Sequence, residues 1–448
     1  MTGSFYHEQT TIGRLFAYLA DYFPSLTRPT ARASSFLVIA IIATQGLRSI
    51  RSLFIRFLQK VSPKSLNIYY HVCQKAHSCI TDFARATIAK SIPLIDDSIR
   101  DIPVLLLLDD TLTPKFGKRF DDVRILFDHA AKDKDKYING HCFVCLTLAF
   151  PIIANSRISW VSVPLMSMLW DKSQTKHQMA VRMVESVMPS LCSKRVFLVF
   201  DSWYANKLMF SLADKYDDLD IICNARSNTV MYEPAPGRTG KRGRPKKRGD
   251  RVVLSQIPLS GVEIGRFKVN KLNVSTNLSG ERIISAFVTE PKDGGGRRLF
   301  LSTADCDVIA RVLRECSFTD DDMPATGDIA GMLPYFLYAK RWSIEVGFYE
   351  MKTFWDMGRY MVRRKDEIEA LVNLIGIAYG MMKILPLADE AFSDYRGLSP
   401  QEVRRQISEQ ILEQRIFVQT ALSLRSEENY FAIVACLRSL IFRFSRAA

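Results

Sequence analysis

Four side chains near residue 340 could bind charged ligands, and their spacing is helical. They are Tyr338, Arg341, Glu345 and Lys352. At about 100° per residue they fall within roughly 60° of one another on one face of a helix predicted over residues 338–352, and no proline interrupts it. The carboxylate could hold a divalent metal ion and the cations could hold phosphate groups. An ordinary solvated helix face would show the same pattern, so the spacing alone leaves both interpretations open.

Two apolar runs upstream end in aspartate. Residues 103–108 are followed by Asp109 and Asp110, and residues 196–200 are followed by Asp201. Short apolar runs of this kind are typical of buried strands, whose final acids would emerge into a cleft. Because neighbouring residues of a strand point to opposite faces, Asp109 and Asp110 are alternatives for the first acid.

The patterns between these acids alternate between strand and helix. Strands are predicted at 141–150, 158–165 and 219–225, and a helix is predicted at 178–187. This alternation indicates an α/β fold in which the aspartates lie on adjacent strand ends.

The segments that flank this α/β region have other patterns. Residues 1–95 are basic and mostly helical in pattern, and further helices are predicted at 368–385 and 399–444. Three segments between the fifth strand and the helix with Glu345 alternate in polarity and predict β-hairpins, namely 266–274, 282–288 and 298–302.

The composition indicates a globular protein with a polyanionic partner. The chain has 448 residues, of which 48% are hydrophobic and 24% charged, and its net charge is +14. Nucleic acid is the first expected partner and a membrane surface the second. The longest apolar run near the N-terminus, residues 36–44, is too short to span a bilayer, and no signal sequence precedes it. We therefore expect a cytoplasmic protein that does not bind membranes.

The nine cysteines are scattered, as in a protein with reduced structural thiols. Two groups could be considered for zinc. Cys142 and Cys145 have no second pair, and the group His71, Cys73, His77 and Cys79 has a spacing that fits no usual zinc finger. Structural roles are the better interpretation of both groups.

The spacing Tyr-x2-Arg-x3-Glu-x6-Lys resembles the Y-R-E-K signature of a large group of bacterial insertion-sequence transposases with a DDE active site. Residues 341–346, Arg-Trp-Ser-Ile-Glu-Val, are similar to that family as well. The resemblance extends over about residues 100–385. It implies an α/β fold with an RNase H-like core that a β-rich insertion interrupts, and with helical N-terminal and C-terminal segments.

The resemblance implies DNA cleavage and strand transfer at the ends of an insertion sequence. Asp109, Asp201 and Glu345 would be the catalytic acids and would hold two Mg²⁺ or Mn²⁺ ions, which suits a reaction that needs metals on the attacking and leaving oxygens. The family pattern Asp-x-Thr selects Asp109 through Thr111, with Asp110 as the alternative.

The resemblance also assigns DNA contacts. Arg341 and Lys352 would hold phosphates near the cut, and Tyr338 would contact the DNA backbone. Residues 241–249 resemble an AT-hook, whose arginines suit the narrow minor groove of A·T tracts. An alternative is a solvated basic loop that touches phosphates without sequence preference. In either case the candidate contacts of this loop are Arg242, Arg244, Lys246, Lys247 and Arg248.

The expected domain organisation follows from these assignments. Residues 1–95 would bind the transposon ends, 96–226 and 326–390 would form the two parts of the catalytic core, 227–325 the insertion, and 391–448 a helical C-terminal segment. Family members assemble on two DNA ends, which implies a homodimer in the synaptic complex. Two other functions are open to such a chain: a domesticated, non-catalytic DNA-binding protein, or a stand-alone metal-dependent nuclease that cuts without joining.

Overall fold

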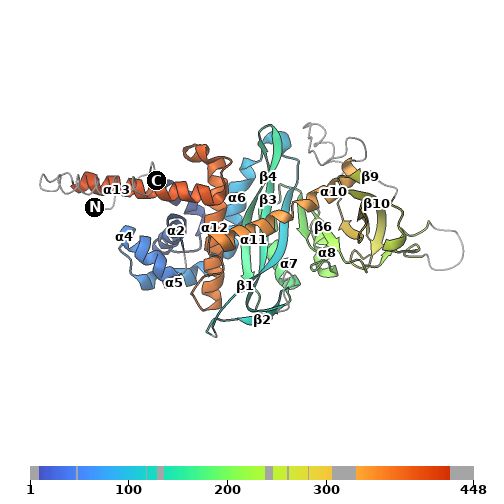
Figure 1. The fold of residues 1–448 in the computed structure, drawn as a ribbon, viewed down its shortest axis with the longest axis horizontal. Helices are drawn as coiled ribbons and strands as arrows, with labels where there is room; N and C mark the ends of the chain where they lie inside the picture. The colour runs from blue at the N-terminus through green and yellow to red at the C-terminus, as the bar shows by residue number, and fades with distance from the viewer. Residues whose placement is uncertain are drawn as a thin grey trace.

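The computed structural model describes residues 10–46, 49–117, 119–128, 136–237, 246–259, 262–280, 282–304 and 329–423. The molecule is elongated (Figure 1). Helices from both ends of the chain form one end, a large sheet lies in the middle, and a smaller group of strands forms the other end.

Five strands form the centre of the sheet. They are β1 (Val104–Pro114), β3 (Tyr137–Ala154), β4 (Arg157–Leu169), β5 (Val196–Phe200) and β6 (Leu219–Ala225). Their order is β4-β3-β1-β5-β6, in which β3 is antiparallel to β1 and β4, whereas β5 is parallel to both β1 and β6. The mixed sheet with its helices confirms the predicted α/β class and is consistent with an RNase H-like core.

The sequence of β1 and β5 explains their central position. Every residue from Val104 to Leu108 and from Val196 to Phe200 is buried, so both strands are covered on both faces, as central parallel strands are. Leu108 pairs with Phe200, and this register brings the next residues, Asp109 and Asp201, to the same edge of the sheet.

The helices of the central region are α7 (Lys176–Val187), α8 (Lys207–Lys215), α10 (Ile329–Ala339), α11 (Trp342–Phe354) and α12 (Lys365–Ala388). Asp109 contacts Arg341, which precedes α11, whereas Asp110 contacts Lys176 of α7. Because neighbouring strand residues point to opposite faces, α11 and α7 cover opposite faces of β1.

One helix prediction is wrong. Residues 338–352 do not form a single helix, because α10 ends at Ala339 and α11 begins at Trp342. At the break, the Arg341 amide donates to Tyr338 O at 3.0 Å, which is a three-residue step, and Ser343 Oγ donates to Lys340 O at 2.8 Å. This serine competes for a carbonyl that a continuous helix would use, and the chain tightens into a turn.

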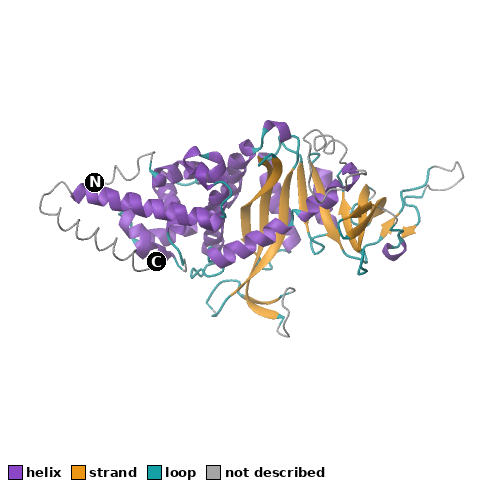
Figure 2. Ribbon diagram, turned by 45° about the horizontal axis from the view of Figure 1, so that its top comes forward, coloured by secondary structure: helices purple, strands orange, loops and turns teal. Residues whose placement is uncertain are grey.

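The strands of the insertion continue the sheet. They are β7 (Met231–Tyr232), β8 (Arg251–Val252), β9 (Val262–Ile264), β10 (Phe267–Thr276), β11 (Ile283–Pro291) and β12 (Arg298–Ser302). β10, β11 and β12 are successive antiparallel neighbours over the three segments predicted as β, and β12 pairs antiparallel with β6. On the opposite side, β2 (Arg124–Phe127) pairs with β3, and Figure 2 shows this two-stranded ribbon projecting from the sheet.

The helical end combines segments that are far apart in sequence. The N-terminal helices are α1 (Thr11–Leu19), α2 (Arg28–Ala43), α3 (Ile50–Leu53), α4 (Gln59–Val61), α5 (Leu66–Ala76) and α6 (Ile80–Ser91), with one π-helical turn over Phe54–Leu58. Short 3-10 turns lie at Ala20–Tyr22, His77–Cys79, Ile92–Leu94, Asp97–Ile99, Met188–Ser190, Leu254–Gln256 and Glu390–Tyr395. The last described helix is α13 (Pro400–Ser423), and part of the predicted helix 399–444 lies outside the described residues.

A buried arginine links parts of this helical end that are far apart in sequence. Arg404 of α13 donates to Ile41 O at 2.9 Å and to Phe354 O at 2.8 Å, and its guanidinium lies over the ring of Trp355 at 4.4 Å. The helix α12 packs against β4, α2 and α6. Among the described helices, α12 alone has the length and composition to cross a membrane, but 89% of its most apolar window is buried inside the protein.

Candidate active site

The structure places Asp109 and Asp201 side by side, at neighbouring positions along the parallel strands β1 and β5. Asp201 follows the last residue of β5, as predicted, but the prediction that Asp109 ends its strand is wrong, because β1 continues to Pro114 with Thr111 and Thr113 buried. Asp109 Oδ1 accepts the Asp110 amide at 2.8 Å, and Asp201 Oδ1 accepts the Trp203 amide at 3.0 Å. Burial raises the pKa of Asp109 to about 7, against the opposing charge of Arg341, and the Asp201 carboxylate raises it further. Burial also raises the pKa of Asp201. Two partly buried carboxylates therefore repel each other at this edge.

Arg341 links the first of these acids to Glu345. Its two terminal nitrogens lie 2.9 Å from Asp109 Oδ2 and 2.5 Å from Glu345 Oε1. Burial lowers the pKa of the guanidinium, but Tyr338, Asp109 and Glu345 together raise it above its ordinary value. The turn between α10 and α11 thus brings Glu345 close to Asp109, and Arg341 lies between these two acids.

Asp110 lies in a different environment. Its Oδ2 accepts from Lys176 Nζ at 2.6 Å and from Cys142 Sγ at 3.2 Å, and its Oδ1 accepts from the Tyr204 hydroxyl at 3.3 Å. The two alternatives, Asp109 and Asp110, thus have different partners. Asp109 shares Arg341 with Glu345, whereas Asp110 faces the helix α7.

Tyr338 and Lys352 lie on either side of this group. The Tyr338 ring packs edge-on against Phe300 of β12 with centroids 4.8 Å apart, and the Arg341 guanidinium lies 5.7 Å from its centroid. Burial raises the pKa of Tyr338 to about 12. Lys352 makes no hydrogen bond or ion pair with another residue of the described part of the chain, and burial lowers its pKa. It is a cation available to a ligand.

A cleft of about 920 Å³ opens at this edge of the sheet. Asp109, Asp110, Asp201 and Lys352 line one part of it. The rest of its wall includes aromatic and basic side chains that sequence reasoning missed, namely Trp170, Lys172, Lys176, Trp203 and Arg226. The one available signal was the Thr175-x-x-Gln178 capping box, which places Lys176 at the start of a helix but says nothing of its partners.

The residues present suit a hard divalent cation. Carboxylate oxygens from Asp109, Asp201 and Glu345 come from three separate elements, and such oxygens are the ligands that Mg²⁺ and Mn²⁺ prefer. Burial and the neighbouring Asp201 raise the pKa of Asp109, and a cation bound there would favour the ionised carboxylate. Within the described residues no three acids, histidines or cysteines already stand in a metal-binding cluster, and the Arg341 guanidinium lies between Asp109 and Glu345.

The basic loop of the insertion is described only in part. Arg242 and Arg244 lie outside the described residues. Lys246 and Lys247 are exposed. Arg248 donates to Asn277 Oδ1 at 2.6 Å and to Gly280 O at 3.1 Å, and its guanidinium lies over the Tyr232 ring at 4.9 Å. Arg248 therefore anchors the end of the loop to the turn between β10 and β11.

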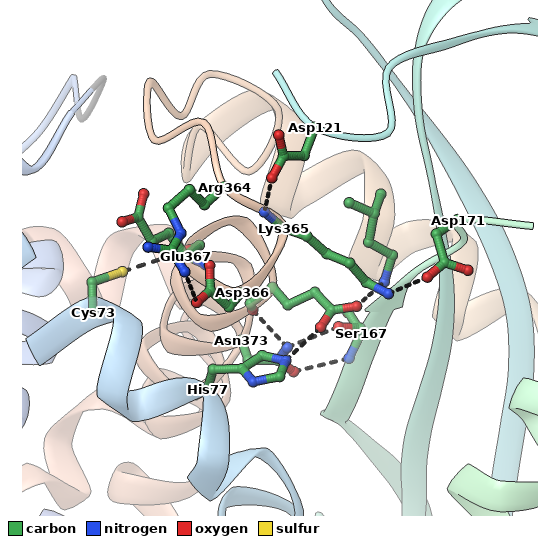
Figure 3. A network of polar contacts seen from close by, with 12 residues as sticks. Cys73, His77, Asp121, Ser167, Asp171, Arg364, Lys365, Asp366, Glu367 and Asn373 are labelled. Carbon is green, nitrogen blue, oxygen red and sulfur yellow. Dashed lines mark hydrogen bonds and ion pairs between the residues drawn. The ribbon is translucent and has the colours of Figure 1, made fainter. Parts of the chain in front are cut away.

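The side chains considered for zinc have protein partners. Cys145 Sγ lies 3.3 Å from Ser167 Oγ, and Cys73 Sγ donates to Glu367 O at 3.5 Å. His77 Nε2 lies 2.7 Å from Glu369 Oε2, and this hydrogen bond raises the pKa of the imidazole. Figure 3 shows His77 and Cys73 within a polar network around the start of α12.

A comparison with models of known protein families shows the family of this chain. The model of the family described as DDE superfamily endonuclease matches residues 21–263, which include Asp109 and Asp201 but not Glu345. No curated protein is similar enough to the chain to count as a relative. Because the family match covers more than half of the 448 residues, the chain belongs to the DDE superfamily endonucleases, and it is an enzyme of the nuclease or transposase type.

Proposed function

We propose that this enzyme is a transposase that binds the ends of an insertion sequence, cuts the DNA there and joins the cut ends to a target. The observation that carries the proposal is the contact of one guanidinium, that of Arg341, with both Asp109 and Glu345 beside Asp201. Asp109 and Asp201 line one cleft with Lys352, and Arg341 ties Glu345, from a distant part of the chain, to Asp109. A protein that only binds DNA has no need of such carboxylates.

Asp109, Asp201 and Glu345 would hold two metal ions, Mg²⁺ or Mn²⁺. When bound, these ions would stabilise charge on the attacking and leaving oxygens of the phosphodiester. Lys352 is available within the cleft to contact a phosphate, and Arg341 is placed to do so once it leaves the carboxylates. Tyr338 contacts both Arg341 and the insertion, so it would hold this arginine in position next to the DNA backbone.

The remaining assignments concern DNA affinity and assembly. The net charge of +14 suits a polyanion, and Lys246 and Lys247, with Arg242 and Arg244, would add phosphate or minor-groove contacts. The basic helices of residues 1–95 would bind the transposon ends. Two copies would hold two ends in the synaptic complex, and the enzyme would act in the cytoplasm on the bacterial nucleoid.

A plasmid assay tests the proposal. The substrate would carry the inverted repeats that flank the coding sequence, and the products would be examined for cut ends and for ends joined to a second plasmid. We expect Mg²⁺-dependent products of both kinds. Cut ends without joined ends would identify a stand-alone nuclease, and binding to the repeats without cutting by the wild-type protein would identify a domesticated DNA-binding protein.

A further inference from the structure

The cleft is lined in part by exposed apolar side chains that the assigned chemistry does not use. Ile125 and Phe127 of β2 and Tyr137 of β3 line the cleft and are 73%, 41% and 65% exposed. Phe127 pairs with Tyr137 in the ribbon, and their rings are edge-on with centroids 5.4 Å apart. Ile125 and Phe127, two residues apart on one strand, share a face. We call this surface, made of Ile125, Phe127 and Tyr137, the ribbon patch.

Cations and further aromatic rings line the same cleft as the ribbon patch. Lys172 and Lys176 lie 5.6 and 5.1 Å from the Trp170 ring centroid, and Lys176 lies 5.0 Å from that of Trp203. Arg226 and Lys352 also line the cleft. The carboxylates of Asp110 and Asp128 lie on this wall too, and Asp110 is neutralised by Lys176 at 2.6 Å.

The chain holds the Trp170–Lys176 part of this wall firmly (Figure 3). Lys365 of α12 forms an ion pair with Asp171, and this pair and Ser173 lower the pKa of Asp171 although burial raises it. Asn373 Nδ2 donates to Ser167 O at 2.8 Å, which fixes the end of β4 to α12. The wall is therefore a built surface and not a chance arrangement of a loop.

We infer that the ribbon patch, together with the exposed Lys172, binds unpaired nucleotides of the DNA, next to the scissile phosphate. Flat exposed rings beside cations are what a single strand needs, because bases stack on rings and phosphates pair with lysines. A fully paired duplex keeps its bases stacked internally and offers mainly phosphates, to which three apolar side chains would contribute nothing. This inference rests on the proposed function for the position of the cut, and it adds the form of DNA that the cleft accepts.

Binding measured without cleavage tests the inference separately from the chemistry. The probes would be a fluorescein-labelled duplex with five unpaired nucleotides at one end and the same duplex fully paired, titrated by anisotropy in EDTA. The variants would be Phe127→Ala, Tyr137→Ala and the double variant. Phe116→Ala is the matched control, because Phe116 is 93% exposed and does not line the cleft. Tyr137→Phe keeps the ring and should behave as the wild type.

We expect the wild type to prefer the tailed duplex, and each alanine to weaken binding of that duplex about fivefold or more with little change for the paired one. An equal loss for both duplexes, or no loss for either, would overturn the inference. A change in sedimentation without a change in DNA binding would also overturn it, because the patch would then be a contact between copies. EDTA prevents cleavage, so binding and cutting are measured independently. If the wild type cuts DNA in Mg²⁺ but shows no preference for the tailed duplex, this inference is wrong and the proposed function stands. If the wild type prefers the tailed duplex but does not cut DNA in Mg²⁺, only the proposed chemistry is wrong.

Discussion

Arg341 lies 2.9 Å from Asp109 Oδ2, so a guanidinium lies where a cation bound by that oxygen would make its contact. The same guanidinium reaches Glu345 at 2.5 Å. A metal ion on these oxygens would be repelled by the positive charge of Arg341, so we expect the guanidinium to weaken metal binding and to move away when the acids take up an ion. A DNA phosphate in the cleft would offer it another anionic partner.

Removal of this arginine should therefore strengthen metal binding in the absence of DNA. We expect Arg341→Ala to bind Mn²⁺ more tightly than the wild type, by about threefold or more, because a competing cation is gone. Arg341→Lys keeps the charge but loses the guanidinium that contacts both Asp109 and Glu345. Its Mn²⁺ affinity should lie between those of the wild type and Arg341→Ala. Titration followed by electron paramagnetic resonance measures free Mn²⁺ directly. Unchanged or weaker Mn²⁺ binding by Arg341→Ala would show that the guanidinium does not compete at these oxygens.

The raised pKa of Asp109 predicts a pH-dependent stability. The pKa of this carboxyl is about 7 in the folded protein and about 3.9 in an unfolded chain, so folding favours the protonated form. The contribution to stability is complete below the unfolded value and is lost as pH rises through 7. In EDTA, Asp109→Asn should gain about 1–4 kcal/mol in the free energy of unfolding, relative to the wild type, between pH 5 and pH 8.

Urea unfolding at several pH values measures this difference. Asp217→Asn, at an exposed position, is the control and should follow the wild type. A constant difference between wild type and Asp109→Asn from pH 5 to pH 8 would show that Asp109 is not held in a repulsive environment.

Asp110 should matter for stability more than for metal binding. Its ion pair with Lys176 is largely buried, with 21% and 13% of the two side chains exposed, and Asp110→Asn would leave Lys176 without its anion. We expect a loss of about 1–3 kcal/mol in the free energy of unfolding and a smaller loss for the double variant Asp110→Asn/Lys176→Met. Mn²⁺ affinity should change little. If Asp110→Asn abolished Mn²⁺ binding and Asp109→Asn did not, the first metal ligand would be Asp110.

The basic loop should contribute salt-dependent affinity. Replacement of Arg242, Arg244, Lys246 and Lys247 by glutamine should lower the affinity for any DNA and flatten the dependence of log K on log salt. Arg248→Gln should differ, because Arg248 bonds to the turn after β10 and its loss would mainly lower stability. Anisotropy titrations between 50 and 300 mM salt, on repeat and on random DNA, would measure both effects. Complete loss of discrimination between the two DNAs would place end recognition in this loop.

Much of the fold is predictable because the local pattern and the tertiary environment agree. The apolar run of residues 104–108 is buried on both faces, so its residue types alone indicate a central strand. The same holds for residues 196–200, and Asp201 follows the end of that strand, whereas β1 continues past Asp109 to Pro114.

The details of the site depend on contacts that no local pattern records. The helix over 338–352 breaks because Ser343 bonds to the Lys340 carbonyl, and helical periodicity cannot show this choice. The choice between Asp109 and Asp110 depends on which of them meets Arg341, 232 residues further along the chain. Lys176 lies near the Trp170 ring, and Lys365 of α12 forms an ion pair with Asp171 in the turn between them. No local pattern shows this ion pair.

The most direct test of the account is the activity of its three acids, measured on the same samples as DNA binding. End-labelled repeat DNA would be incubated with Mg²⁺ and the wild type, Asp109→Asn, Asp201→Asn or Glu345→Gln, and resolved on denaturing gels over time. The account predicts that each variant binds the DNA within about threefold of the wild type and fails to cut it, because carboxylates hold the metals and cations hold the phosphates. Near-normal cleavage by Glu345→Gln would contradict the assignment of the active site.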